Sequence, residues 1–159
     1  MSKIHIAMVG IYFLSNLYII GEFNHLDLSL VGLLKLVALL LGLGLLVPIK
    51  IYRKWLTISI YEYLILNLIA IAPLLCALII FTNDTFKSDV YYESYKIEKS
   101  EWVKGKIIFY LENNQYDEKE YLRSIKDNEE FEKFGTENLA IFFSDGLWGI
   151  RIIEKKRVH

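Results

Sequence analysis

Apolar residues are concentrated in three long stretches in the first half of the chain, whereas the second half mixes apolar with charged positions. The stretches cover about residues 4–20, 28–49 and 55–81. A helix rises 1.5 Å per residue, so roughly 20 residues cross the ~30 Å hydrocarbon core of a bilayer. Backbone groups in lipid must be bonded within their own segment, and we therefore interpret all three stretches as transmembrane helices.

The first stretch has a second interpretation as a signal peptide, because Lys3 precedes its apolar run. The chain continues as Gly21-Glu22-Phe23-Asn24, which is no small-residue cleavage site. We therefore expect a retained helix. Residues 1–81 are predicted to form a transmembrane domain, and residues 82–159 a small soluble domain.

The segregation of charge predicts an orientation. The basic residues that flank the stretches fall on one side of an alternating chain: Lys3, Lys50, Arg53 and Lys54. The loop between the first two stretches holds instead Glu22 and Asp27. Short loops rich in Lys and Arg stay in the cytoplasm, so three crossings place the N-terminus inside and the C-terminal domain outside. Frequent Ile, Lys, Asn and Tyr are typical of an AT-rich bacterial genome, which predicts the bacterial cytoplasmic (inner) membrane.

Strand-like patterns begin after the third stretch. Residues 88–99 and 106–112 are rich in Val, Ile, Tyr and Phe. Tyr91, Tyr95 and Ile97 fall on one face of an alternating pattern, which is typical of a half-buried strand.

Two further patterns complete the expected soluble domain. Asp145-Gly146 separates two strand-like runs and favours a hairpin with a two-residue type I′ turn. Residues 116–134 show helical spacing at Tyr121, Leu122 and Ile125, then a short helix with Phe131 and Phe134, capped by Asp127 or Asn128 and ended by Gly135. The expected fold is therefore three transmembrane helices plus a small C-terminal α+β domain, with an antiparallel sheet of about four strands.

Two charged side chains and two asparagines lie within the predicted spans. Lys35 and Glu62 are each about 10 Å deep, from opposite ends of their helices. These depths disfavour a direct pair and leave three interpretations: snorkelling to the interface, contact with a partner protein, or an ion or proton path. Asn16 and Asn67 are expected to hydrogen-bond to neighbouring helices.

Small residues at helical spacing mark candidate packing faces. Ala38, Gly42 and Gly44 lie on the second stretch, and Ala72 and Cys76 on the third. Small side chains let helix backbones approach closely, within the chain or between copies. Cys76, the only cysteine, is interpreted as a packing residue.

The sequence contains none of the common catalytic and ligand-binding motifs that we looked for. No phosphate-binding, dinucleotide-binding, zinc-protease, nucleophile-elbow or paired-cysteine motif occurs. His25 with Glu22 and Asp27 forms a polar cluster, interpreted as a solvated turn in preference to a weak cation site. A net charge of −1 excludes a basic nucleic-acid binder. We therefore expect no enzyme, no cofactor and no metal.

Two functional hypotheses remain. The first is a non-enzymatic integral membrane protein whose soluble domain binds a protein partner, with helices that anchor it in the lipid bilayer and support homo-oligomers. The alternative is a membrane effector or channel-like component of a bacterial defence (antiviral) or toxin–immunity system, motivated by Lys35, Glu62 and the glycines of the second stretch. Three helices are too few for a transporter with inverted repeats.

Overall fold

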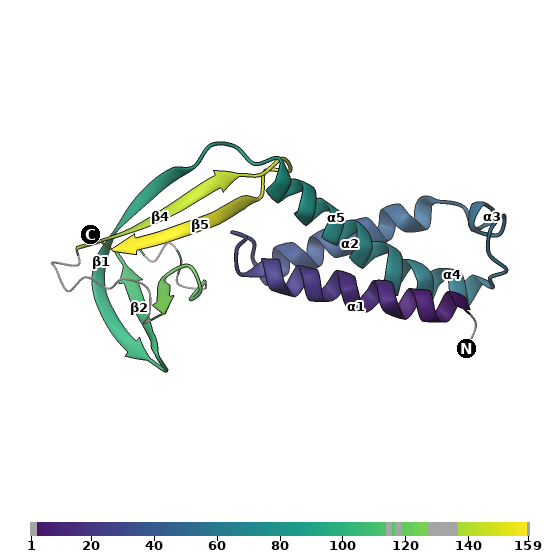
Figure 1. The fold of residues 1–159 in the computed structure, drawn as a ribbon, viewed down its shortest axis with the longest axis horizontal. Helices are drawn as coiled ribbons and strands as arrows, with labels where there is room; N and C mark the ends of the chain where they lie inside the picture. Colours follow the sequence, from purple (N-terminus) through teal and green to yellow (C-terminus); the bar gives the residue numbers. More distant parts are fainter. Residues whose placement is uncertain (1–2, 114–115, 117–118, 127–136, 159) are drawn as a thin grey trace. The chain divides into compact units, whose positions relative to one another are not determined.

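The chain folds into two compact units, one helical and one built on a sheet (Figure 1). The computed structural model describes residues 3–113, 116, 119–126 and 137–158. The helical unit comprises Met1–Phe23 and Leu28–Thr85. The sheet unit comprises Phe86–His159 together with Asn24–Asp27, the short segment between the first two helices.

The helical unit contains α1 (Lys3–Phe23), α2 (Leu30–Leu46), α3 (Ile49–Tyr52), α4 (Ile60–Leu66), the π-helix η1 (Asn67–Ile71) and α5 (Ala72–Thr85). Within the part of the chain that the structure describes, two helices are long and apolar enough to cross a membrane, His5–Phe23 and Ile60–Thr85. With 17 residues, α2 spans only about 26 Å, so length and composition do not establish the third predicted crossing.

The third apolar helix begins later than the sequence pattern indicates. It starts at Ile60, because Ser59 caps it. The Ser59 hydroxyl accepts a hydrogen bond from the Glu62 N–H (3.2 Å), and the Glu62 carboxylate accepts one from the Ser59 N–H (2.8 Å). This capping box stabilises a helix start at Ile60. Trp55 lies outside the helix and is 85% exposed, so the predicted boundary at residue 55 is wrong.

The first apolar helix extends to Phe23, beyond the predicted end at residue 20, whereas the second is shorter than predicted. The second ends at Leu46 instead of residue 49, since Val47 and Pro48 adopt extended backbone conformations. The residue before a proline is driven out of the helical region. Near Pro73 the long third helix widens into η1. Proline cannot donate to the carbonyl four residues earlier, and a π-turn is a common way to accommodate such a break.

The described residues of the sheet unit form a five-stranded antiparallel sheet in the order β3-β2-β1-β4-β5. Its strands are β1 (Tyr91–Val103), β2 (Lys106–Leu111), β3 (Ser124–Lys126), β4 (Asn138–Asp145) and β5 (Arg151–Val158). The first half of β1 pairs with β4 and the second half with β2, with an irregularity between Ile97 and Lys99. A bulge at this point lets one long strand bend and serve both halves of the sheet (Figure 1).

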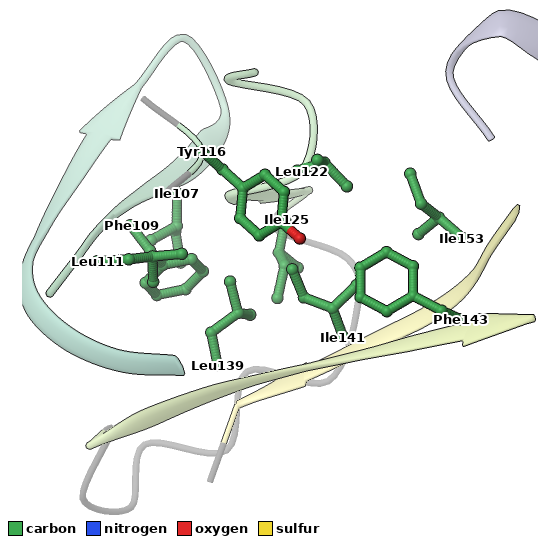
Figure 2. Packing of buried hydrophobic residues seen from close by; sticks show 10 residues of the cluster. All are labelled: Ile107, Phe109, Leu111, Tyr116, Leu122, Ile125, Leu139, Ile141, Phe143 and Ile153. Carbon is green, nitrogen blue, oxygen red and sulfur yellow. The ribbon is translucent and has the colours of Figure 1, made fainter. Parts of the chain in front are cut away.

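One face of the sheet carries the core. Figure 2 shows ten buried side chains of this core, which come from β2, β3, β4 and β5 and from the chain before β3. The fully buried members include Phe109, Leu122, Leu139, Ile141 and Phe143. The predicted face of β1 is confirmed, because Tyr91, Tyr95 and Ile97 pack against this cluster.

The predicted helix over residues 116–134 is wrong where the structure describes it. Residues 124–126 form β3, and Ile125 pairs with Ile107 on the edge of β2. The Phe109 N–H also donates to the Arg123 carbonyl at 2.8 Å. Pairing with the open edge of β2 therefore makes residues 124–126 a strand. Such tertiary pairing outweighs the weak helix propensity that the local spacing indicates. The expected helix with Phe131, Phe134, the cap at Asp127 or Asn128 and Gly135 lies outside the described residues.

The predicted hairpin between β4 and β5 is present, but its turn is longer than expected. β4 ends at Asp145 and β5 begins at Arg151, and the positive φ falls on Gly149 (73°) instead of Gly146. Two consecutive positive φ angles occur in the β1–β2 turn, at Lys104 (49°) and Gly105 (77°). A two-residue turn of the type I′ class is therefore found between β1 and β2, and not between β4 and β5.

Candidate interaction site

The segment Asn24–Asp27 is part of the sheet unit although it lies between two apolar helices in the sequence. Leu26 forms an antiparallel bridge with Ile152 and is 2% exposed. The Asp27 N–H donates to the Arg151 carbonyl at 2.8 Å, and the Ile153 N–H donates to the His25 carbonyl at 2.7 Å. The segment therefore covers the outer edge of β5 at the start of that strand.

The carboxylate of Asp27 holds this arrangement through two cations. One oxygen accepts from Arg151 Nε (3.0 Å) and Nη2 (2.5 Å), and the other accepts from Lys119 Nζ. The Asp27 side chain is only 6% exposed. Hydrogen bonds between ionised groups are about twice as strong as neutral ones, and burial strengthens them further.

Arg151 links Asp27 to a second carboxylate and to the core. Its Nη1 donates to Glu93 at 3.2 Å and 3.3 Å, and its Nη2 donates to the Tyr116 hydroxyl at 3.1 Å. Its guanidinium lies 4.5 Å from the ring centre of Phe143. Asp27 and Glu93 thus balance Arg151 and Lys119, so the charges in this network compensate one another.

The tyrosines of the network are stabilised as neutral hydrogen-bond donors. Burial raises the pKa of Tyr95 far above its usual range, and the hydrogen bond that it donates to Glu93 raises it further. Burial also raises the pKa of Tyr121 to about 12, with a contribution from the charge of Asp27. The Tyr121 hydroxyl donates to the Leu26 carbonyl at 3.2 Å. Both phenols therefore stay protonated at neutral pH, and the hydrogen bond from Tyr121 helps to hold Leu26 in place.

The opposite face of the sheet presents aromatic and basic side chains to water. We call Tyr92, Phe142, Lys155 and Arg157 the outer face. Tyr92 and Phe142 are directly paired across β1 and β4, with ring centres 5.7 Å apart. Arg157 lies 5.7 Å from the Phe142 ring, and Lys155 is paired with Phe142 across β5. Tyr92 is 66% exposed, so this face can contact another molecule without rearrangement.

The charged residues singled out in the predicted spans are not brought together. Glu62 caps α4 and lies 3.8 Å from His5 Nε2, in the first turn of its helix instead of deep within it. Lys35 is exposed on α2. Asn16 donates to the Tyr12 carbonyl of its own helix at 2.8 Å, so its hydrogen bond is local and not the one to a neighbouring helix that the sequence predicts.

Asn67 meets one of the small residues of the sequence analysis. It is fully buried, and its Nδ2 donates to the Tyr63 carbonyl at 2.9 Å. Its Oδ1 has no hydrogen-bond partner within the described part of the chain and points at Gly44 of α2. The Tyr63 hydroxyl donates to the carbonyls of Val47 (2.7 Å) and Leu45 (3.0 Å), which satisfies the end of α2.

The other small residues divide into two groups. Ala72 and Cys76 are fully buried in the helical unit, where α5 packs against α1 and α2. Ala38 and Gly42 are exposed, and a Cβ added to Gly42 meets no atom within 4 Å. The face of α2 with Ala38 and Gly42 is therefore not used for packing among the described residues.

The cluster of His25, Glu22 and Asp27 is organised differently from a solvated turn. Asp27 is buried against Arg151 and Lys119, and the His25 carbonyl accepts from Ile153. Within residues 3–113, 116, 119–126 and 137–158, no group of three or more His, Cys, Asp or Glu side chains could hold a metal ion.

No family model matches this chain. The curated proteins and the solved structures likewise contain no significant match. Its interactions must therefore be inferred from the geometry of the network and of the outer face.

Sequence reasoning missed the pairing of Asp27 with Arg151, although one signal for it was present. Arg151 and Ile153 share a face of an alternating strand, so the apolar side of β5 carries a cation. A cation on a buried face needs an anionic partner. The pattern therefore required a carboxylate, but it did not specify one that lies 124 positions earlier in the chain.

Proposed function

We propose that this chain is a non-enzymatic integral protein of the bacterial cytoplasmic membrane whose sheet unit binds a protein partner outside the cytoplasm. The outer face is the observation that carries the proposal. The paired rings of Tyr92 and Phe142 offer apolar area at low cost in conformational entropy, and Lys155 and Arg157 add positive charge beside them. Exposed aromatic residues next to arginine are the composition of energetically important interface centres. The expected partner is a protein with an acidic surface.

The membership of residues 24–27 in the sheet unit supports three crossings. Those residues and residues 86–158 fold together and must therefore lie on one side of a membrane. The chain between them must cross an even number of times. With Ile60–Thr85 as one crossing, for which its length and apolar composition qualify it, we propose α2 as the second crossing and α1, which precedes both, as the third. The basic residues between α2 and α4 then favour the cytoplasm for that connection.

The test is capture of the partner by full-length protein. The tagged chain is expressed with its genomic neighbours, cross-linked in cells and purified in mild detergent. We expect a stoichiometric partner that is lost when Tyr92→Ala and Arg157→Glu are combined. Trp102→Ala is the matched control, because Trp102 is similarly exposed at 59% but lies outside the outer face. No partner and no self-association, or equal capture by both variants, would contradict the proposal.

A membrane effector or channel-like component remains the second candidate, and one observation favours it. Lys35, Ala38 and Gly42 follow each other at helical spacing and are all exposed on α2. Small residues on an unused face favour association between copies, and a ring of lysines could line a pore. Ion flux through proteoliposomes tests this candidate. Flux that is absent in the wild type, or that Lys35→Leu leaves unchanged, rules out a Lys35-lined pore.

A further inference from the structure

A second exposed apolar surface lies at one end of the sheet unit. We call Phe86, Val90, Leu147 and Trp148 the anchor patch; they are 64%, 55%, 55% and 58% exposed. The segment after α5 is fastened to the β4–β5 turn by the hydrogen bond from the Ser88 N–H to the Asp145 carbonyl (2.8 Å) and by the one from the Asp145 N–H to Ser88 Oγ (3.0 Å). Phe86 and Val90 therefore lie two positions on either side of a residue that is hydrogen-bonded to Asp145, which is two positions before Leu147.

The turn itself is closed and presents Leu147 and Trp148 at its tip. The Gly146 N–H donates to the Ile150 carbonyl at 3.2 Å, and the Gly149 N–H donates to the Gly146 carbonyl at 2.9 Å. Gly149 adopts a φ of 73°, which a side chain disfavours. The turn is thus a defined structure with two large apolar side chains at its end.

Every covalent connection between the sheet unit and the apolar helices is made at this end. Phe86 directly follows Thr85, the last residue of α5. Residues 24–27 run directly into α1 and α2 and pair with residues 151–153, which begin just after the same turn. From Thr85 to Ser88 the chain reaches at most about 11 Å. This end of the sheet unit therefore holds the residues that continue directly in the sequence into the apolar helices.

We propose that the anchor patch inserts into the headgroup region of the bilayer leaflet that faces the sheet unit. The inference rests on the membrane location proposed above and names the lipid surface as the occupant of the patch. Tryptophan partitions to this region because its apolar ring with a polar N–H suits a boundary between hydrocarbon and water. Phenylalanine and leucine beside it add apolar area that is buried at the same depth. Such contact fixes the orientation of the sheet unit and leaves the outer face free for a protein.

The chain contains a matched reference residue. Trp102 is 59% exposed and lies next to the β1–β2 turn, eleven positions along β1 from Tyr91. That separation is about 36 Å measured along the strand. Because no connection to a helix is made near Trp102, this side chain is expected to stay in water.

The experiment uses full-length single-tryptophan variants in lipid nanodiscs with lipids brominated near the headgroup. Trp55→Phe with Trp102→Phe leaves Trp148, and Trp55→Phe with Trp148→Phe leaves Trp102. A third variant replaces all three tryptophans by phenylalanine and carries Phe81→Trp in α5, where Phe81 is 53% exposed. This last variant, measured also with lipids brominated deeper in the chains, reports whether the helix is in lipid.

We expect blue-shifted Trp148 emission with at least twofold quenching, while Trp102 emission stays near that of water and changes little. Equal quenching of Trp148 and Trp102, with Phe81→Trp quenched, overturns the anchor patch and leaves the membrane location intact. Blue-shifted Trp148 emission without quenching indicates cover by protein, such as a second copy, and also overturns it. An unquenched Phe81→Trp variant contradicts the membrane location and the anchor patch together.

Discussion

The carboxamide oxygen of Asn67 lies 2.6 Å from the point where a Cβ on Gly44 would be. Asn67 opens η1, and its Nδ2 is held by the Tyr63 carbonyl. Glycine at position 44 is therefore what lets a buried polar side chain lie against α2. Asn67 and Gly44 together form one close contact between η1 and α2.

Gly44→Ala is expected to destabilise the helical unit by about 1–3 kcal/mol, because the added methyl group overpacks the contact with Asn67. Gly42→Ala is the matched control. Its Cβ meets no atom within 4 Å, and alanine is the better helix former, so its effect is neutral or stabilising by up to about 1 kcal/mol. Thermal unfolding in detergent, followed by circular dichroism at 222 nm, measures both. Equal midpoints for the two variants contradict this account.

Asp27→Asn is expected to destabilise the sheet unit by about 2–3 kcal/mol. Removing one partner of a buried ion pair costs about 3–5 kcal/mol, and water relieves part of this because the side chains of Arg151 and Lys119 are 30% and 25% exposed. Denaturant unfolding followed by tryptophan fluorescence measures the loss, and hydrogen exchange at the Ile153 amide reports release of the segment.

Glu101→Gln is the control for Asp27→Asn, because it breaks an ion pair with Lys99 that is open to solvent. Exposed pairs contribute little to stability, so we expect no measurable change. If the two substitutions have the same effect, the Asp27 network does not stabilise the fold.

Glu154 predicts a pH dependence of stability. Partial burial acts to raise its pKa, but the hydrogen bonds with Lys87 and Ser144 outweigh it, so the pKa is lowered overall. Both contacts are 2.7 Å long. The folded state therefore binds fewer protons than the unfolded state, and the stabilisation is present above the ordinary glutamate pKa of about 4.3 and disappears below it.

Glu154→Gln is expected to cost about 1 kcal/mol at pH 7 and to flatten the loss of stability between about pH 5 and pH 3. Unfolding midpoints at several pH values provide the measurement, and Ser144→Ala, which removes one of the two donors, should give a smaller effect. Identical pH profiles for wild type and Glu154→Gln show that this carboxylate does not contribute.

The proposed orientation predicts opposite accessibility of two engineered cysteines. In a Cys76→Ala background, Ser94→Cys places a thiol on an exposed position of β1 and Lys54→Cys places one between α3 and α4. A maleimide that cannot cross membranes should label the first in intact spheroplasts and the second only after lysis. Labelling of Lys54→Cys before lysis, with Ser94→Cys protected, reverses the orientation.

Elements whose buried residues recur at a regular spacing could be predicted from local sequence patterns. The apolar stretches, the alternating face of β1 and the hairpin of β4 and β5 could be predicted because burial selects residues at fixed spacing. β3 could not be predicted, since Ile125 pairs with Ile107 only after β2 has formed an edge. The position of Asp27 depends in the same way on a cation far away in the sequence, and no local pattern records that distance.

The 124 positions between Asp27 and Arg151 also separate these residues in time. At about 5–20 residues per second, a ribosome needs roughly 6–25 s to reach Arg151 after making Asp27. During that interval Arg151 is not yet available to pair with the Asp27 carboxylate. Residues 24–27, which will cover the edge of β5, lie in the sequence between α1 and α2. The sheet unit is therefore completed only after α2 and α5 have been synthesised, and a chain that stops before β5 lacks the Arg151 partner of Asp27.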